Sequence, residues 1–495
     1  AIAWGLTNLG PDVSDLYIEK VNPENPNQYE VNGEWVDMEL RTEVFEVAGG
    51  GSEELVVRST RHGPVITEVF GLEDFAEQSG VALPGEFTLS FRWTGLQPGF
   101  VIEAILGFNR AQDWEAFRQA AEKFSAPSQN ILFADLEGNI GYQAPGLIPI
   151  RNPGHTAELP VPGWTDEYEW QGFIPFEELP FAFNPPEGYI VTANNAITTP
   201  DYPHLLSVVF DYGYRAERIV DLIENAPGSV NLEYMKEIQR DEVDLNVQTL
   251  LPVLLQIPLE GELAQARSIL EGWDHQNGME SAPAALFQVF WKNLLAETFH
   301  DELPEDHWPG GGSRWYEVMR DIVPDPASHW WDDQTTPQVE GRDEIFARAF
   351  QDAVLEIEGT LGSNPDRWTW GDLHTLTLRN QSLGVSGQAL IESLFNRGPY
   401  RASGGSSIVN ATGWDAGGES YEVVSLPSMR MILDLGDFSN SVAIHPTGQS
   451  GHAYHRHYAD MVDLWRGHQY HRMLWEEADI LEDSSRRLRL LPGQS

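Results

Sequence analysis

The sequence predicts an α+β fold, because strand patterns occupy both ends of the chain and helical periodicity occupies its middle. Residues 1–213 contain short runs of alternating apolar and polar side chains, separated by loops rich in Gly and Pro. Residues 214–365 place apolar side chains at helical spacing, and strand patterns return over residues 366–450, before a C-terminal helix within residues 451–495. We therefore expect one unit over residues 1–495, in which a helical segment is inserted into a core of strands.

Individual elements support this division along the chain. A helix is expected over residues 113–124, where apolar side chains recur three to four positions apart after Asp113, a residue type that caps helices. Residues 130–133 and 139–143 predict two strands joined by a tight turn that contains Gly138. The other expected strands cover residues 28–47, 55–58, 86–93, 189–193, 428–435 and 441–444.

The composition excludes several functional classes. The chain has 495 residues, with 30 Lys+Arg against 76 Asp+Glu, a formal net charge of −46, and no Cys. This charge repels phosphate backbones and anionic lipids, so we expect neither nucleic acid nor a membrane surface as a partner. The lack of Cys excludes disulfides, thiolate zinc sites and a cysteine nucleophile. No run of the sequence approaches the roughly 20 apolar residues that a membrane span needs.

The acidic residues are spread along the chain, which predicts a carboxylate-rich surface. Such a surface suits a protein that works in high salt, although an ordinary acidic protein from a GC-rich genome has the same composition. The chain begins at Ala1, without Met or an apolar leader, so we expect an internal fragment or a processed product.

Asp12 and Asp15 form the first candidate site. Two carboxylates three residues apart, with a backbone carbonyl between them, can converge on a hard cation such as Ca²⁺, which takes oxygen ligands. The same spacing also occurs where two Asp side chains cap a turn, so the residues alone leave both interpretations open.

Asn194 forms the second candidate site, at the end of the strand expected over residues 189–193. Arg218 follows 24 residues later, on an expected helix. A carboxamide at the end of a strand can donate to an oxyanion that develops during a reaction. Asn is also common in turns, which is the alternative interpretation.

Five His residues near the C-terminus form the third candidate site: His452, His455, His457, His468 and His471. The last two are three residues apart on an expected helix and could share a metal, whereas solvated or aromatic-packed imidazoles explain the same pattern. No Gly-x-Ser-x-Gly elbow precedes a helix. A carboxylate pair for glycoside hydrolysis stays a rival, because 76 acidic residues and 17 Trp supply candidates.

Several segments together resemble the penicillin acylase family of N-terminal-nucleophile hydrolases. They occur in the order of that family and are spread over most of the chain. The segments are AWGLTNLGPDVSDLY (residues 3–17), TRHGPVI (60–66), NILFADLEGNIGYQAPGLIPIR (130–151), LPVPGWTDEYEWQGFIPFEELPFAFNPPEGYIVTANN (159–195), GYRAERI (213–219) and residues 429–451, which end in GQSG.

The resemblance implies the αββα layered sandwich of the N-terminal-nucleophile (Ntn) hydrolases. It places this chain in the β-subunit region, some dozens of residues after the catalytic serine. It also implies a precursor that cuts itself, so the expected protein partner is the α subunit from the same precursor. In this family the serine's own amino group is the general base. We expect this chain alone to be inactive, because it lacks that serine.

The resemblance also implies catalytic roles by motif position. Asn8 supplies a backbone N–H to the oxyanion hole, and Asn194 supplies the side-chain donor. Arg218 supports Asn194 and the amino terminus of the nucleophile. Leu6 lines the acyl pocket, where an apolar side chain suits an aliphatic or aromatic acyl group.

The calcium site of the family falls on the loop that carries the first candidate pair. Its expected ligands are the carboxylates of Asp12 and Asp15 and the carbonyls of Ser14 and Ala157. Asp211 is expected as a further carboxylate, although the spacing around it departs from the family pattern. Structural Ca²⁺ is the only cofactor that the resemblance implies.

From this resemblance we expect an amide hydrolase that acts on a small N-acyl amide, such as a β-lactam, an acyl-homoserine lactone or a lipopeptide. The sequence does not choose among them, because the acyl pocket is shared with the α segment. We expect a location outside the cytoplasm, in the periplasm or secreted. A non-catalytic family member that binds such molecules and a carboxylate-pair glycosidase are the alternatives.

Overall fold

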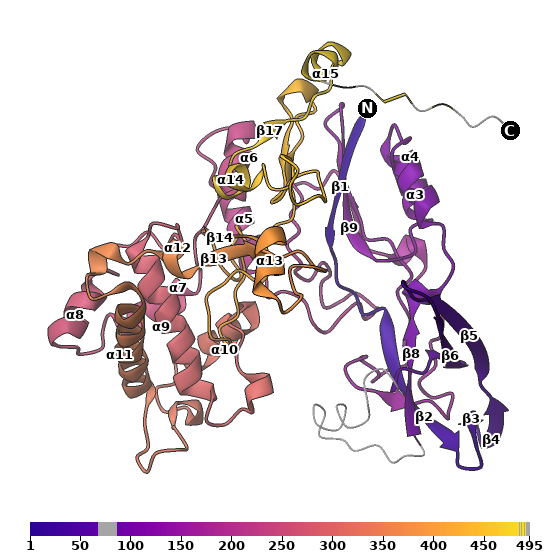
Figure 1. The fold of residues 1–495 in the computed structure, drawn as a ribbon, viewed down its shortest axis with the longest axis horizontal. Coiled ribbons are helices and arrows are strands. Elements are labelled where there is room, and N and C mark those ends of the chain that lie inside the picture. Colours follow the sequence, from indigo (N-terminus) through magenta and orange to yellow (C-terminus); the bar gives the residue numbers. More distant parts are fainter. Residues whose placement is uncertain (68–86, 485, 487, 490, 492–495) are drawn as a thin grey trace. The chain divides into compact units, whose positions relative to one another are not determined.

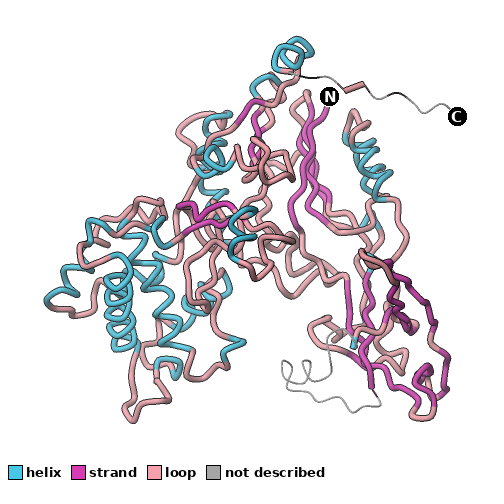
Figure 2. The backbone as a smooth tube through the Cα atoms, viewed as in Figure 1, coloured by secondary structure: helices cyan, strands magenta, loops and turns pink. Residues whose placement is uncertain are grey.

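The computed structural model describes residues 1–67, 87–484, 486, 488, 489 and 491. The chain divides into two compact units, Ala1–Asp211 and Tyr212–Ser495, which we call unit 1 and unit 2. Both contain helices and strands, which confirms the predicted α+β class (Figure 2).

Unit 1 contains a four-stranded antiparallel sheet that begins with the first strand of the chain. Its order is β1-β9-β10-β12, and β1 pairs with β9 from Ile2 opposite Asp135 to Asn8 opposite Gln129. The predicted pair of strands with a turn at Gly138 is confirmed, since β9 and β10 are adjacent and Gly138 has a φ of +87°. The strands are β1 (Ile2–Asn8), β9 (Gln129–Asp135), β10 (Ile140–Gln143) and β12 (Phe181–Phe183).

Two helices, α3 (Val101–Phe108) and α4 (Trp114–Ala121), pack on β9. The prediction for α4 is confirmed, and the Asp113 side chain caps it by accepting from the Ala116 N–H at 2.8 Å. The sequence did not predict α3. Its run of apolar residues is partly exposed, with Ile102 at 67% exposure, so no polar face marks it as a helix.

A second sheet of unit 1 is built around β2. Strand β8 pairs with β2 from Ser14 opposite Trp93 to Lys20 opposite Phe87, which confirms the strand predicted to end at Trp93; Glu86 lies outside the described residues. Strands β5, β6 and β7 form a separate antiparallel group (Figure 1). The strands are β2 (Ser14–Asn22), β3 (Asn25–Val31), β4 (Glu34–Asp37), β5 (Glu39–Glu46), β6 (Ser52–Thr60), β7 (Gly63–Pro64), β8 (Phe87–Trp93) and β11 (Val161–Pro162).

The strand predicted over residues 189–193 is wrong. These residues form no ladder and run as irregular backbone to Asn194, whose φ is +67°. Ile190 instead packs against the cluster of Leu9, Tyr142 and Ala144. The alternation of apolar side chains therefore records packing against a core, without a partner strand.

Unit 2 begins with helices, and α5 to α11 lie within residues 214–365, where helical periodicity predicted them. Helix α9 is buried around most of its circumference, and its Phe290 ring contacts Phe346 and Phe350 of α11 at centroid distances of 5.7 and 6.0 Å. An all-round apolar helix belongs in a core, and α9 forms the centre of this one. The helices are α5 (Tyr214–Glu224), α6 (Leu232–Gln239), α7 (Val247–Leu254), α8 (Gly261–Ser268), α9 (Ala282–Phe299), α10 (Ser313–Ile322) and α11 (Arg342–Leu361).

The rest of unit 2 is a mixture of short strands and helices. Strands β15 and β16 lie within the predicted ranges 428–435 and 441–444 but are only three residues long each. The elements are α12 (Trp370–Leu373), β13 (Thr375–Leu378), α13 (Ala389–Phe395), β14 (Arg397–Arg401), β15 (Arg430–Ile432), β16 (Val442–Ile444), α14 (Val462–Arg466), β17 (His471–Arg472) and α15 (Glu477–Asp483). Single-turn 3₁₀ helices lie at Thr94–Leu96, Phe176–Glu178, Glu305–His307, His329–Trp331, Pro365–Arg367 and Phe438–Asn440.

The C-terminal helix predicted within residues 451–495 is wrong as a single helix, because the described residues there form two short helices, α14 and α15, with strand β17 between them. Helix α14 ends at Arg466 with Gly467 as its C-cap, and the next residue, His468, has a φ of +52°, which a right-handed helix does not allow. The chain then pairs as β17 with β16 before α15 begins. Among the described residues, no helix has both the length and the apolar character of a membrane-spanning segment.

Candidate active site

The two predicted oxyanion donors meet at the end of β1. The Asn194 side chain donates from Nδ2 to the Asn8 carbonyl at 2.8 Å, although 186 residues separate the two. Next to this contact, the hydroxyls of Thr7 and Thr192 lie 2.8 Å apart. The structure therefore brings together Asn8 and Asn194, which the sequence analysis placed in one site.

A third Asn supports this contact and was missed by the sequence analysis. Asn130 is fully buried on β9 and donates to the same Asn8 carbonyl at 3.0 Å. Its own carbonyl oxygen accepts from the Tyr142 hydroxyl at 2.7 Å, which fixes the orientation of the amide. The signal in the sequence was a polar residue within an apolar strand. Two donors on one carbonyl hold the end of β1 in place.

The backbone of Asn194 is held as well. Its φ of +67° lies in the left-handed region, which Asn tolerates better than most residues. Its carbonyl accepts from the Asp211 N–H at 3.0 Å, and Asn195 and Asp211 form a parallel bridge. Asp211, which was predicted as a calcium ligand, therefore lies beside Asn194.

Leu6 lies on β1 opposite Ile131 and is 49% exposed. An exposed apolar side chain two residues before Asn8 is compatible with contact to an acyl chain. Its place in an acyl pocket stays a prediction.

A guanidinium lies against three of the predicted calcium ligands. Arg151 donates from Nε to both oxygens of Asp15, at 3.0 and 3.2 Å. Its Nη2 donates to the carbonyls of Asp12 and Ser14, at 3.0 and 3.3 Å. The indole N–H of Trp170 also donates to Asp15. The loop oxygens thus converge on one cationic position, which here holds an arginine.

The carboxylates of Asp12 and Asp15 differ in the direction of their pKa shifts. Burial alone would raise the pKa of Asp15, but the neighbouring His155 and Arg151 outweigh it and hold that pKa below its ordinary value. Burial does raise the pKa of Asp12, whose side chain accepts only a long hydrogen bond from Val208 N–H, at 3.4 Å, together with a contact from Ser207. The negative charge of Asp12 is therefore incompletely balanced.

The donor set fits a hard cation in part. Asp12 offers an under-compensated carboxylate, and Ala157 lies two residues after His155, whose Nε2 is 3.4 Å from Asp15. However, no group of three or more His, Asp or Glu among the described residues is arranged to hold a metal. Asp211 thus does not complete a three-carboxylate cluster with Asp12 and Asp15.

Arg218 lies in unit 2, on α5, and is paired with a buried acid. Its Nε and Nη2 donate to the two carboxylate oxygens of Asp241, at 2.9 and 2.7 Å. Asp241 is 7% exposed and follows α6. The sequence did not indicate Asp241, because no spacing rule links it to an arginine 23 residues earlier.

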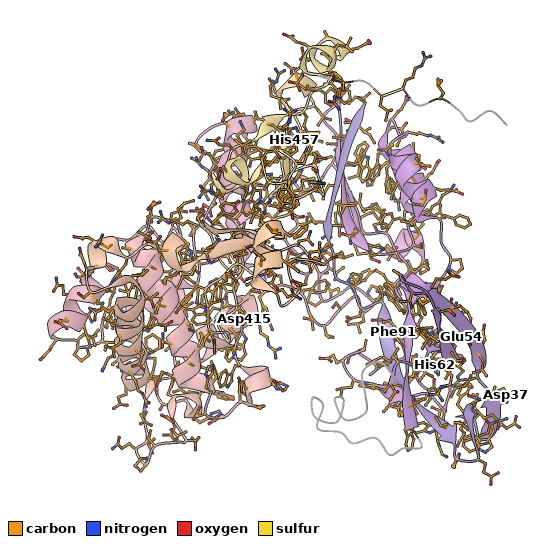
Figure 3. The ribbon with its side chains drawn as sticks, in the orientation of Figure 1. Asp37, Glu54, His62, Phe91, Asp415 and His457 are labelled. Atoms are coloured by element: carbon orange, nitrogen blue, oxygen red, sulfur yellow. The ribbon has the colours of Figure 1, made fainter. Side chains whose placement is uncertain are left out.

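The C-terminal His residues do not form one group. His457 contacts Asp460 at 2.5 Å, and Figure 3 marks its position in unit 2. His468 lies against Glu242 at 3.2 Å, whereas His471 is exposed on β17 and its Nδ1 contacts the carbonyl of Arg472. His457, His468 and His471 therefore each have a separate partner.

A buried His in unit 1 lies within a network of charged side chains, although no sequence motif marked it as a site residue. His62 Nδ1 lies 2.7 Å from Glu19, and Nε2 lies 2.7 Å from Glu169. Its ring stacks on Tyr17 with centroids 3.7 Å apart, and Figure 3 shows it among the strands of unit 1. Arg92 also bonds Glu169, at 2.7 Å. The only signal was the segment TRHGPVI, in which His62 stands.

Comparison with known proteins identifies the family. Residues 1–482 match the family model described as penicillin amidase. The acyl-homoserine lactone acylase QuiP of Pseudomonas aeruginosa is 31% identical over 95% of this chain and 59% of that protein, and the penicillin G acylase of Escherichia coli is 33% identical over 65% of this chain and 38% of that protein. The chain thus spans about three-fifths of the length of the QuiP relative.

A solved structure shows the same fold. The thermostable penicillin G acylase from Alcaligenes faecalis matches with a TM-score of 0.69 and 23% identity, over 100% of this chain and 89% of that chain. This likeness confirms the predicted Ntn-hydrolase fold. Together with the match of the family model, it shows that the chain belongs to the penicillin amidase family.

Proposed function

We propose that the complete protein is an amide hydrolase that removes the acyl group from a small N-acyl amide. A serine that precedes this chain attacks the amide carbonyl, with its own amino group as the base. The Asn8 N–H and the Asn194 side chain bind the tetrahedral oxyanion, and water then releases the carboxylic acid. The α segment of the same precursor completes the site.

One observation carries this proposal, the contact between Asn194 Nδ2 and the Asn8 carbonyl. An amide nitrogen has two hydrogens. A group that is oriented through one of them can present the other to a substrate oxygen. Asn130 also donates to the Asn8 carbonyl, and Tyr142 holds the Asn130 side chain. The donor is therefore arranged before substrate arrives, which is the condition for strong oxyanion stabilisation.

The names of the relatives direct the choice of substrate. Several relatives that align with 95–100% of the chain are called acyl-homoserine lactone acylases, and a relative called penicillin acylase 2 proenzyme aligns with 94% of it. N-acyl homoserine lactones are therefore the first substrates to test, and penicillins the second. Both are linear amides, so family membership favours this reaction over a carboxylate-pair glycosidase.

The test uses the complete precursor and measures release of the free amine. We expect Asn194→Ala to lower kcat/KM by roughly a hundredfold, because loss of one oxyanion donor costs about 3 kcal/mol. Asn184→Ala is the matched control, since Asn184 also has a left-handed backbone, with a φ of +49°, and its side chain also binds backbone. Hydrolysis by Asn194→Ala at the rate of the control would overturn the proposal. Negligible hydrolysis of both substrates by the parent protein would favour a non-catalytic family member.

We propose, in addition, that Asp12, Asp15 and the carbonyls of Ser14 and Ala157 hold a structural Ca²⁺ in the complete protein. The proposal is supported by oxygen atoms that face one cationic position and by the under-compensated charge of Asp12. Arg151 then shares the Asp15 carboxylate with the ion. We place the complete protein outside the cytoplasm by analogy with this family.

A further inference from the structure

A pocket in unit 2 combines arginine side chains with uncharged donors and has no acidic residue in its lining. It has a volume of about 280 Å³, and its lining comes from the end of β13, the start of β14 and the loop before α14. Acidic residues outnumber basic ones by 76 to 30 in this chain, so a lining with arginines and no acid differs from the chain as a whole. The polar lining includes Arg379, Asn380, Gln381, Arg397, Ser450 and Tyr458.

The guanidinium of Arg397 is held in place by neutral groups. Nη1 donates to the carbonyls of Leu394 and Asn396, at 3.1 and 2.7 Å, and Nη2 donates to the carbonyl of Ala453 at 2.6 Å. The guanidinium carbon also lies 4.7 Å from the ring centre of Tyr458. The direction of the guanidinium is therefore fixed, although none of these groups carries a negative charge.

The positive charge of Arg397 is not balanced by an ion pair. Among the described residues, no carboxylate lies within 4.0 Å of its nitrogen atoms. Arg379, in the same pocket, instead lies 2.6 Å from Glu422, and Arg401, on the same strand as Arg397, lies 2.8 Å from Glu280. Arg397 thus carries a charge that an anion in the pocket can neutralise.

Capping of the preceding helix explains part of this arrangement. Leu394 lies in the last turn of α13 and Asn396 is its C-cap, so a cation beside their carbonyls is favourable. However, the Ala453 carbonyl belongs to the loop before α14, and Tyr458 of the same loop donates its hydroxyl to the Phe395 carbonyl at 2.7 Å. A helix cap needs neither this loop nor a pocket beside it, so capping leaves the pocket unexplained.

Other polar side chains of the lining offer donors. Asn380 Oδ1 accepts from the N–H groups of Ser382 and Leu383, at 3.1 and 2.9 Å, so its amide can offer a ligand the Nδ2 hydrogens. Ser450 Oγ accepts from the His452 N–H at 3.2 Å, and its own hydroxyl hydrogen is not used in that bond. A charged guanidinium flanked by neutral donors is suited to binding an anion.

We infer that this pocket is a binding site for a small organic monocarboxylate, whose carboxylate pairs with Arg397. One unbalanced guanidinium matches a single negative charge, whereas a phosphate dianion would leave one of its charges unpaired. Leu378, Ala459 and the ring of Tyr458 add apolar surface to the same lining, where a short alkyl chain can lie. The volume of about 280 Å³ is small for a ligand pocket, so a short-chain acid fits better than a long one. The site lies wholly within unit 2 and does not depend on the proposed reaction.

Titration of the complete protein with sodium butanoate tests the inference, with butanamide as a neutral ligand of similar shape. Calorimetry at constant ionic strength should show saturable binding of butanoate, about tenfold or more tighter than that of butanamide, because the amide cannot form the charged pair. Bound butanoate should also slow hydrogen exchange in residues 379–397 and 447–459. Lack of saturable butanoate binding, or equal affinities for the acid and the amide, would overturn the inference. Tighter binding of inorganic phosphate would overturn the choice of a carboxylate.

An acid can also bind at the proposed active site as the product of the reaction, so a variant has to locate the binding. Gln381 lines the pocket, is exposed, and is not among the partners of Arg397. Gln381→Glu introduces a competing carboxylate and should weaken butanoate binding by about tenfold or more. Gln248→Glu makes the same change of charge at an exposed position of α7 and should change the Kd by less than about twofold. Equal Kd values for these two variants would place the bound acid elsewhere and overturn the inference.

Arg397→Gln separates ligand binding from capping of α13. The variant should weaken butanoate binding by about tenfold or more, because the charged partner is lost. Arg320→Gln is the matched control, since Arg320 is 60% exposed and lies 2.6 Å from Glu317 on α10, and it should keep the parental Kd. A purely capping role would lower the melting temperature of Arg397→Gln and leave its Kd unchanged, which would overturn the inference. If Arg397→Gln does not fold, the comparison of Gln381→Glu with Gln248→Glu decides.

Discussion

Replacing His62 with Gln should destabilise unit 1 in a way that depends on pH. Both ring nitrogens of His62 face carboxylates at 2.7 Å, and only the protonated imidazolium donates from both nitrogens. Burial would lower the pKa of His62, but the hydrogen bonds and charges of Glu169 and Glu19 outweigh it and raise that pKa above 6.5. The structure therefore holds a buried cation between two anions.

The sign of the pH dependence follows from the raised pKa. The folded state binds the His62 proton more tightly than the unfolded state does. The stabilisation is fully present below the unfolded pKa of 6.5 and is lost as the pH rises through the folded pKa. At the acidic end, Glu169 has its pKa lowered to about 2, because His62 and the arginines outweigh the burial that would raise it. Its contribution is present above 4.5 and is lost as the pH falls toward 2.

The magnitude can be bounded in two ways. Removing one partner of a buried ion pair costs about 3–5 kcal/mol. The shift of the Glu169 pKa from 4.5 to about 2 corresponds to at most about 3.4 kcal/mol, and to less after screening, because a quarter of that side chain is exposed. Both figures describe the same interaction and count once. Gln can donate to one of the two acids, so we expect a loss of about 3 kcal/mol near pH 6.

The assay is urea unfolding of the complete protein at several pH values between 5.5 and 9, with hydrogen exchange as a local readout. Exchange should increase most in residues 163–171, where Glu169 and Trp170 dock on β2 and β8. His204→Gln is the matched control, because His204 also lies 2.7 Å from an acid, Glu178, which is 54% exposed. Its effect should stay below about 1 kcal/mol.

The difference between parent and His62→Gln should shrink as the pH rises, since the parent then loses its own imidazolium. Equal losses at pH 6 and pH 9 would refute the bridging imidazolium. A loss near that of the His204 control at every pH would refute the energetic argument as a whole.

Three further outcomes follow from other parts of the chain. Chelation of Ca²⁺ should lower the melting temperature of the complete protein, by an amount that corresponds to about 2.7 kcal/mol if the ion was present at a hundred times its Kd. Asp12→Asn should abolish this difference, and an unchanged melting curve of the parent protein in chelator would contradict the calcium proposal. Burial raises the pKa of Asp244 from 3.8 to about 6, so the stabilisation of the folded protein by this group is full below pH 3.8 and falls by about 3 kcal/mol as the pH rises through 6. The urea midpoint of Asp244→Asn should not show this fall between pH 3.8 and 6, and the same fall in the variant as in the parent would contradict the assignment to Asp244. Phe290→Ala in the helical core should cost about 3–5 kcal/mol in urea unfolding, whereas Val339→Ala, at 85% exposure, should cost little; similar losses in both would contradict the assigned core.

The elements that the sequence predicted correctly are those whose determinants are local. Helix α4 carries its own cap at Asp113, and the turn between β9 and β10 carries Gly138 at the position of positive φ. Residues 189–193 failed for the opposite reason. Their alternation arises from the packing of Ile190 on a distant cluster, and a strand also needs a neighbour that the local sequence does not specify.

The candidate site also contains residues that the sequence indicated and partners that it did not. Motif resemblance placed Asn8 and Asn194 in one site before any contact between them was visible, and the 2.8 Å hydrogen bond brings them together. The partners of the charged residues were not accessible in this way. With 76 acids in the chain, nothing local selects Asp241 for Arg218 or Arg151 for Asp15, which lie 23 and 136 residues apart. These pairs are determined by the three-dimensional fold.

The choice of partner also decides what each charged residue can do. An arginine that is paired with a buried carboxylate is held in one direction, whereas an arginine that faces only solvent is free to move. Arg151 is a different case, because the oxygen atoms that accept its hydrogen bonds would also suit a metal ion. A residue role that is carried over from a family motif therefore has to be tested together with its partner. In this chain Arg218 and Asp241 form such a pair, and each member can be changed without removing the other.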